Sequence, residues 1–172
     1  MHILETERLI LREIDSAADA EFILELLNSP GFLRYIGDRG VRNVEQSREF
    51  IEGRLRKSYA DNGFGLYAVE LSTDNTPLGI CGFVKRDGLD HADIGFAFLP
   101  QFEKKGYAVE SARAVMEYGR GVLGLDRVLA ITTPDNENSG RLLEKLGFSY
   151  VKLMTLPNSD EQIKLFASGP QP

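Results

Sequence analysis

A short loop in the middle of the chain carries residues that could hold an anion. The stretch from Pro100 to Gly124 reads PQFEKKGYAVESARAVMEYGRGVLG, with Lys104, Lys105 and Gly106 directly before a helical pattern. The first backbone N–H groups of a helix have no partner within it, and together they attract negative charge. Glycine lets the backbone come close to a ligand because it has no Cβ. The pattern predicts a strand–loop–helix unit that binds a phosphate-bearing ligand.

The loop lacks the two common nucleotide-binding fingerprints. Its EKKGYA core fits neither G-x-G-x-x-G nor G-x-x-x-x-G-K-[ST], so we expect neither a dinucleotide nor a nucleoside triphosphate there. Strand–loop–helix junctions with a glycine are also common where nothing binds. The loop alone leaves that alternative open.

Other reactive side chains are few. Cys81 lies in the apolar run GICGF with no histidine beside it, so we interpret it as a core residue and not as a nucleophile. The chain's two histidines and one cysteine have no metal-ligand spacing, and we expect no metal site.

The loop belongs to a longer ordered pattern. ADIGFAFLPQFEKKGYAVESA is followed, after one strand, by TTPDNENSGRLLEKLGF, and the chain opens with LETERLILREI. This set resembles the GNAT N-acetyltransferase superfamily over nearly the whole chain, and most closely its RimJ/RimL type, the ribosomal-protein-alanine acetyltransferases. EKKGYA stands in the place of the family's acetyl-CoA loop, [QR]-x-x-G-x-[GA]. Glu103 replaces the usual Gln or Arg, and Lys104 replaces a common first glycine.

The resemblance implies that acetyl-CoA is the cosubstrate. In the family, the pantetheine arm lies between two splayed strands, which correspond here to Ile94–Leu99 and Arg127–Thr133, and bonds to strand backbone. A side chain of the second segment also contacts the arm. The implied binding residues are Phe96, Ala97, Phe98, Lys104, Lys105, Gly106, Tyr107, Ala108, Val109, Asn136 and Ser139.

Acetyl transfer to an amine needs a proton acceptor, stabilisation of the carbonyl oxygen and well-positioned reactants. The resemblance points to Asp93 as the base, where many relatives have glutamate, although solvation at a strand edge explains this carboxylate nearly as well. Leu143 occupies the place of the family's usual tyrosine acid. Ser139 is then the substitute acid, or simply a serine in the first turn of a helix.

The acceptor amine is only partly defined. By resemblance, the two N-terminal helices and the segment between them form one wall of its site, with Phe32, Tyr35 and Asp93 as candidate contacts; the two aromatic residues fit a core role as well. A protein N-terminus and a small amine, such as a polyamine or an amino sugar, both remain open. A non-catalytic acyl-CoA-binding protein is the alternative function.

The elements that must position these residues follow from periodicity and turn signals. We predict helices at about 16–28, 44–60, 106–124 and 137–146, and an irregular segment at 31–43. Strands are expected at 4–14, 65–71, 78–85, 91–99, 127–133, 148–156 and 163–168. A strand that follows a crossover helix lies parallel to the strand before it. The expected fold is an α/β (α+β) domain with a mixed, mostly antiparallel sheet, a central splayed parallel pair and about four helices.

Composition sets the remaining limits. The 172 residues fit one domain, 1–172, and 42% of them are hydrophobic. The net charge of −6 disfavours nucleic acid as a partner. With no signal peptide, no apolar run long enough to span a membrane and a single cysteine, the expected location is the cytoplasm. The family resemblance allows a homodimer.

Overall fold

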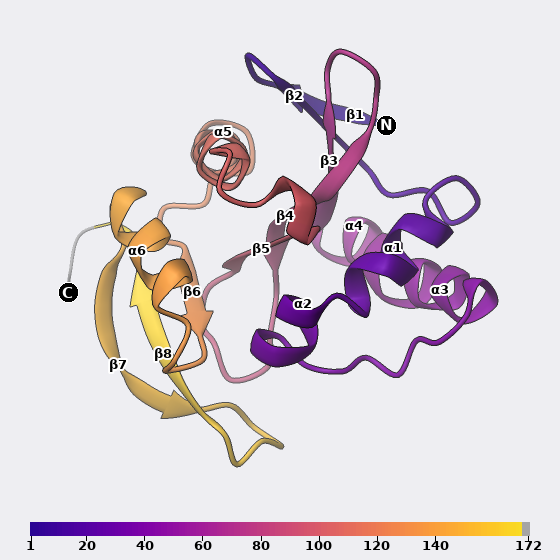
Figure 1. Ribbon diagram of the computed structural model, residues 1–172. Helices are drawn as coiled ribbons and strands as arrows, with labels where there is room; N and C mark the ends of the chain where they lie inside the picture. The colour runs from indigo at the N-terminus through magenta and orange to yellow at the C-terminus, as the bar shows by residue number, and fades with distance from the viewer. Residues whose placement is uncertain (170–172) are drawn as a thin grey trace.

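The computed structural model describes residues 1–169 and contains one eight-stranded sheet (Figure 1). The strands lie in the order β1-β2-β3-β4-β5-β6-β8-β7, and every neighbouring pair is antiparallel except β5 and β6. This matches the predicted mixed sheet with one parallel pair. The strands are β1 (His2–Glu5), β2 (Leu9–Arg12), β3 (Leu66–Leu71), β4 (Pro77–Val84), β5 (Asp93–Phe98), β6 (Leu129–Thr132), β7 (Ser149–Thr155) and β8 (Gln162–Ala167).

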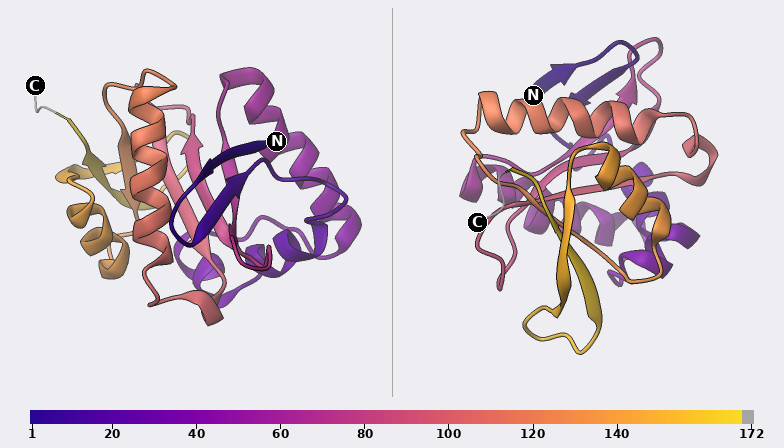
Figure 2. Two further views of the ribbon diagram at one scale, coloured as in Figure 1. Left: turned by 90° about the horizontal axis from the view of Figure 1, so that it is seen from above. Right: turned by 90° about the vertical axis from the view of Figure 1, so that its left-hand side faces the viewer.

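Helices cover both faces of the sheet (Figures 1 and 2). On one face, Ala68 and Ala97 contribute to a core shared with α1, α2, α3 and η1; on the other, Tyr67 and Phe98 share a core with α5 and α6. The helical segments are α1 (Ala20–Leu27), α2 (Pro30–Tyr35), α3 (Val44–Phe50), the π-helical η1 (Ile51–Arg56), α4 (Lys57–Asn62), the 3₁₀ turn η2 (Pro100–Phe102), α5 (Tyr107–Gly121) and α6 (Glu137–Lys145).

The prediction of one long first strand was wrong. Residues 4–14 instead contain the end of β1, a turn and β2, and the two strands pair with each other. Thr6 makes the turn: its N–H donates to the carbonyl of Leu9 at 2.9 Å, and its hydroxyl accepts the N–H of Leu9 at 3.1 Å. A threonine hydroxyl that bonds nearby backbone competes with strand pairing, which explains the break.

The N-terminal helices also differ from the prediction. The segment 31–43 was expected to be irregular, but it contains most of α2, which Pro30 begins at a position where its missing N–H costs nothing. Helix α1 starts four residues later than expected. Asp15 accepts the N–H groups of Ala17 and Ala18 in a separate turn.

The predicted helix at 44–60 was confirmed as α3, η1 and α4 in succession, and Asn43 caps it. Asn43 accepts the N–H of Gln46 at 2.8 Å, and Gln46 in return accepts the N–H of Arg42 at 2.7 Å. Its middle is wound as η1, with π-type bonding, which the sequence pattern did not predict.

The two halves of the sheet barely join at β5 and β6. Among the described residues, Asp93 opposite Leu129 is the only paired position between these strands, and the N–H of Leu129 donates to the carbonyl of Ala92 at 2.9 Å. Beyond that position the strands diverge, as the resemblance implied. Within the described chain, no helix has the length and apolarity that a membrane span requires.

Candidate active site

The loop before α5 presents unpaired backbone N–H groups to solvent. Gly106 is the N-cap with φ +83°, and Lys104 has φ +60°, so both occupy the left-handed region. The first bond of the helix runs from the N–H of Glu110 to the carbonyl of Gly106. The N–H groups of Tyr107, Ala108 and Val109 therefore have no partner inside the helix. Because the predicted loop residues 103–106 are exposed, an anion can reach this helix end.

Arg8, which the sequence interpretation missed, fastens this loop. From the β1–β2 turn it donates to the carbonyl of Lys105 at 3.0 Å and to the carboxylate of Glu110 at 2.7 Å, and its guanidinium lies 4.5 Å from the ring centre of Tyr107. Burial alone would raise the pKa of Glu110, but bonds from Thr6 and Arg8 lower it. No local pattern could reveal this contact, which joins residues about a hundred positions apart.

The unusual Glu103 is directed away from the helix end. Its carboxylate oxygen lies 3.9 Å from the position that a Cβ on Gly31 would occupy, at the start of α2. The negative charge is therefore turned toward α2, which limits its repulsion of an anion at α5. The family's usual glycine at position 104 is explained as well, because Lys104 takes a backbone conformation that glycine adopts without strain.

The gap between β5 and β6 is lined by free backbone groups. The N–H of Leu99 donates to Leu78 of β4, whereas the carbonyl of Ala92 accepts from β6. Since backbone groups alternate sides along a strand, Phe96 and Phe98 direct their N–H and C=O groups into the gap. Ala97 directs its own toward β4, opposite Ile80. Of the three predicted strand contacts, the two phenylalanines have the required orientation.

Asn136 and Ser139 meet at the start of α6. The side-chain oxygen of Asn136 accepts the N–H of Ser139 at 3.3 Å, and its amide donates to the Ser139 hydroxyl oxygen at 3.1 Å. Asn136 is therefore the N-cap of α6. Because the hydroxyl oxygen accepts in this contact, its proton remains available to another acceptor.

Asp93 is buried at the closed end of the gap. Only 1% of its surface is exposed, which contradicts the alternative that solvent at a strand edge accommodates it. Its carboxylate accepts from Nε of Arg86 at 3.1 Å. Burial raises the pKa of Asp93 to about 6, and the nearby Arg86 opposes that rise. A carboxylate with this pKa is mostly ionised at neutral pH and can still accept and release a proton.

The comparisons with known proteins agree with this geometry. Residues 8–149 match the family described as "Acetyltransferase (GNAT) domain". The chain belongs to this family. YoaA of Bacillus subtilis, an uncharacterized N-acetyltransferase, is 34% identical over 147 residues, covering 85% of this chain and 82% of YoaA.

Two further GNAT proteins are named for different kinds of acceptor, a small polyamine and a ribosomal protein. Spermidine N(1)-acetyltransferase of Escherichia coli is 34% identical over 132 residues, covering 76% of this chain and 68% of that enzyme. The structure of RimL, a ribosomal L7/L12 alpha-N-protein acetyltransferase in complex with coenzyme A, shares the fold with a TM-score of 0.75 and 20% identity, over 97% of both chains. The chain is accordingly a GNAT N-acetyltransferase with a RimL-like fold.

The candidate acceptor residues of this GNAT chain lie on α2. Phe32 is 7% exposed and packs in the core beneath the N-terminal helices. Tyr35 is partly buried, and Arg34 lies 4.8 Å from its ring centre. Packing therefore accounts for Phe32, and its contact with an acceptor stays a prediction, as does that of Tyr35.

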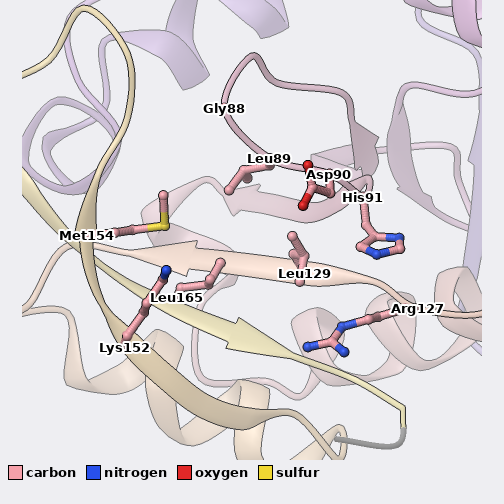
Figure 3. Close-up of a pocket in the computed structure, with 9 residues that line it drawn as sticks. All are labelled: Gly88, Leu89, Asp90, His91, Arg127, Leu129, Lys152, Met154 and Leu165. Carbon is pink, nitrogen blue, oxygen red and sulfur yellow. The ribbon is translucent and has the colours of Figure 1, made fainter. Parts of the chain in front are cut away.

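Three other residues take no part in the site's geometry. Cys81 and Leu143 are fully or almost fully buried in the core, and burial raises the pKa of the Cys81 thiol to about 12. His91 is exposed at the rim of a separate cavity of about 310 Å³, opposite Lys152 and Met154 (Figure 3). That cavity lies at the amino ends of β5 and β6, away from the α5 N-terminus.

Proposed function

We propose that this protein transfers an acetyl group from acetyl-CoA directly to a primary amine. What carries the proposal is the exposed N-terminus of α5, at the carboxyl end of β5, where β5 and β6 have already diverged. The anion site at the N-terminus of α5 lies next to the gap between β5 and β6, which offers free backbone groups. This arrangement fits a ligand with a phosphate head and an amide-bearing arm.

Each part of the donor would meet a matching group. The N–H groups of residues 106–109, with Lys104 and Lys105, would hold the pyrophosphate. The backbone of Phe96 and Phe98 would bond to the pantetheine amides, and Asn136 would bond to the same arm from the other side. When bound, acetyl-CoA supplies an activated acetyl group as a thioester.

The reaction itself needs three actions from the chain. A backbone N–H facing the gap, at Phe96, would stabilise the developing negative charge on the carbonyl oxygen. Asp93 would take the proton of the incoming ammonium group, directly or through one water molecule. Ser139 would donate its hydroxyl hydrogen to the departing sulfur. Because free thiols have a pKa of roughly 8.5, the departing thiolate needs little help, and we expect the effect of Ser139 to be modest.

Direct transfer is favoured over an acyl-enzyme. The only thiol in the chain, Cys81, is completely buried and its pKa is raised to about 12. A thiol in that state supplies almost no thiolate at neutral pH. The amine must then attack the donor itself, with both substrates bound together.

Calorimetric titration of coenzyme A into Gly106→Val tests the donor site. A Cβ at Gly106 would lie 3.2 Å from Nη2 of Arg8, and φ +83° disfavours any side chain. We expect affinity to fall at least tenfold. Gly121→Val, at the exposed far end of the same helix with open space around it, is the matched control. Equal affinities for the two variants would exclude this site. Tight binding without turnover on any amine would instead favour a non-catalytic acyl-CoA-binding protein.

A further inference from the structure

The cavity of about 310 Å³ at the amino ends of β5 and β6 begins where the gap between these strands closes (Figure 3). Leu129 lines the cavity and is also the residue opposite Asp93 in the single pair between the two strands. The donor site lies at the carboxyl end of β5, where the strands have diverged. A ligand in the gap and a ligand in the cavity would therefore approach this strand pair from opposite ends.

The cavity and the Asp93 side chain lie on the same face of the sheet. Val128 and Ala130 belong to the core under α5 and α6, so Leu129 between them is directed to the other face. Ile94 belongs to that same core, which directs the neighbouring Asp93 to the face of Leu129. Because paired positions on one face are neighbours, the candidate base borders the inner end of the cavity.

The floor of the cavity is apolar. Leu129 and Leu165 form it, and Leu89 and Met154 pack against them. The members of this cluster come from strands and from the β4–β5 loop, whereas α1, α2, α3 and η1 cover the same face over β3, β4 and β5. An apolar group of a ligand would find a matching surface on this floor.

Charged side chains surround the floor. Arg127, just before β6, and Lys152, on β7, reach toward it from two sides (Figure 3), and Asp90 is the carboxylate among the lining residues. Within residues 1–169, no carboxylate lies within 4.0 Å of the side-chain nitrogens of Arg127 or Lys152. The cavity therefore combines an apolar floor with two unpaired cations, against one carboxylate.

We propose that this cavity binds the acceptor, and that the acceptor is a small amine with an apolar body and a carboxylate, as in apolar amino acids. Its amino group would lie at the inner end, beside Asp93, and its apolar body would lie on Leu129 and Leu165. Arg127 and Lys152 would bind its carboxylate through charge-assisted hydrogen bonds. The proposal rests on the proposed function and names the acceptor class.

The size and charge of the cavity disfavour the other acceptors. Its volume of about 310 Å³ is at the lower end of the range of about 300–1,000 Å³ for ligand sites, which suits a small molecule better than a peptide segment. A polyamine would meet Arg127 and Lys152 with positive charges of its own. The net charge of −6 on the whole chain does not offset this repulsion, because charges more than about 8 Å away are largely screened at physiological salt.

Turnover of two amino acids with similar amines tests the apolar floor. Acetyl-CoA turnover is measured as thiol release on leucine, on alanine, on spermidine and on a peptide with an N-terminal leucine. We expect kcat/KM to be at least tenfold higher for leucine than for alanine, because leucine has the larger apolar body. Spermidine and the peptide should react more slowly than leucine.

Binding of analogues that cannot react tests the carboxylate separately from catalysis. Isocaproate and isocaproamide both have the body of leucine and lack its amine, and only isocaproate carries a negative charge. Calorimetric titration in the presence of coenzyme A should give at least tenfold tighter binding for isocaproate. Isocaproate should also compete with leucine for turnover.

Variants connect this preference to the cavity. Arg127→Gln with Lys152→Gln should bring the affinity ratio of isocaproate to isocaproamide close to one. Because Arg127 is partly buried, Lys152→Gln alone, at an exposed position, should also lower the ratio and does not depend on the folding of the double variant. Arg120→Gln with Lys145→Gln removes the same charges from exposed positions near the ends of α5 and α6, and should keep the ratio.

Three outcomes would overturn the inference. Equal affinities for isocaproate and isocaproamide would refute it, as would a preference for isocaproate that survives when both cations are replaced. Spermidine or the peptide reacting as well as leucine would refute the acceptor class and leave acetyl transfer standing. No turnover on any amine would refute the proposed function, and with it the role of the cavity as an acceptor site, even if isocaproate binds.

Discussion

Replacing Asp93 by asparagine should slow acetyl transfer most at low pH. The wild-type carboxylate, with a pKa of about 6, can take the proton of a bound ammonium group at any pH above that value. In the Asp93→Asn variant, only the small fraction of amine that is already neutral can react, so the rate is proportional to that fraction. That fraction grows tenfold with each pH unit until the pKa of the amine is reached.

The size of the effect follows from the difference between two pKa values. An α-amino group has a pKa of roughly 7.7–8.0, about two units above that of Asp93. The ratio of wild-type to variant kcat/KM should therefore be about 100 below pH 6, fall tenfold per unit, and approach one near pH 8. For an amine with a pKa of roughly 10.4, the low-pH ratio would be about 10⁴.

Steady-state kcat/KM from pH 5 to 10 measures this ratio directly. Asp93→Glu, which keeps a carboxylate, should retain the shape of the wild-type profile. Wild-type and Asp93→Asn profiles that run parallel at every pH would remove Asp93 from proton transfer. Its role would then be to position Arg86.

Unfolding experiments provide an independent check on the same group. The folded-state pKa of Asp93 lies above its unfolded value of 3.8, so the folded protein binds more protons between the two values. The free energy of unfolding should thus fall by about 3 kcal/mol as pH rises from below 4 to above 6. Because this group cannot titrate in Asp93→Asn, the variant should lose that part of the pH dependence.

Two further substitutions test the donor site. Ser139→Ala should lower kcat by less than about tenfold and leave acetyl-CoA affinity intact, because a thiolate leaves readily unaided. The hydrogen bond from the Ser139 backbone N–H to Asn136 survives in this variant. A fall in Tm without a fall in kcat would show that the serine has only a structural role. Lys104→Gly should relieve a left-handed backbone that costs about 1–2 kcal/mol, partly offset by about 0.5–1 kcal/mol of glycine entropy. Denaturant unfolding should show a net gain, and a loss would contradict the assigned strain.

Most of the sheet and the main helices could be predicted from the sequence because each has a local signal. The hairpin of β3 and β4 and the capped helix that begins after Asn43 depend on neighbours in the chain. The break between β1 and β2 was missed because it depends on one threonine hydroxyl. Helix α2 was missed because a proline commonly follows the end of a helix, whereas Pro30 lies in the first turn of a new one.

In the candidate site too, the parts with a local sequence signal could be predicted and the parts that join distant segments could not. The loop before α5 and the cap at Asn136 are short motifs, so their positions could be predicted. The attachment of Arg8 to that loop joins distant segments, and composition or spacing does not encode it. The burial of Asp93 likewise depends on the distant β6, which pairs with β5 at this position.

Because β5 and β6 pair at a single position, the sheet consists of two halves, β1–β5 and β6–β8, that are connected by one residue pair. The core beneath α5 and α6 is continuous across them, but their hydrogen-bond ladder is not. A donor seated in the gap would bond to both edges and take the place of the missing rungs. A bound donor would then fix the position of β1–β5, which carry the acceptor wall, relative to β6–β8. Without the donor, the distance between the two halves would be less fixed. This difference gives a physical reason for the donor to bind first.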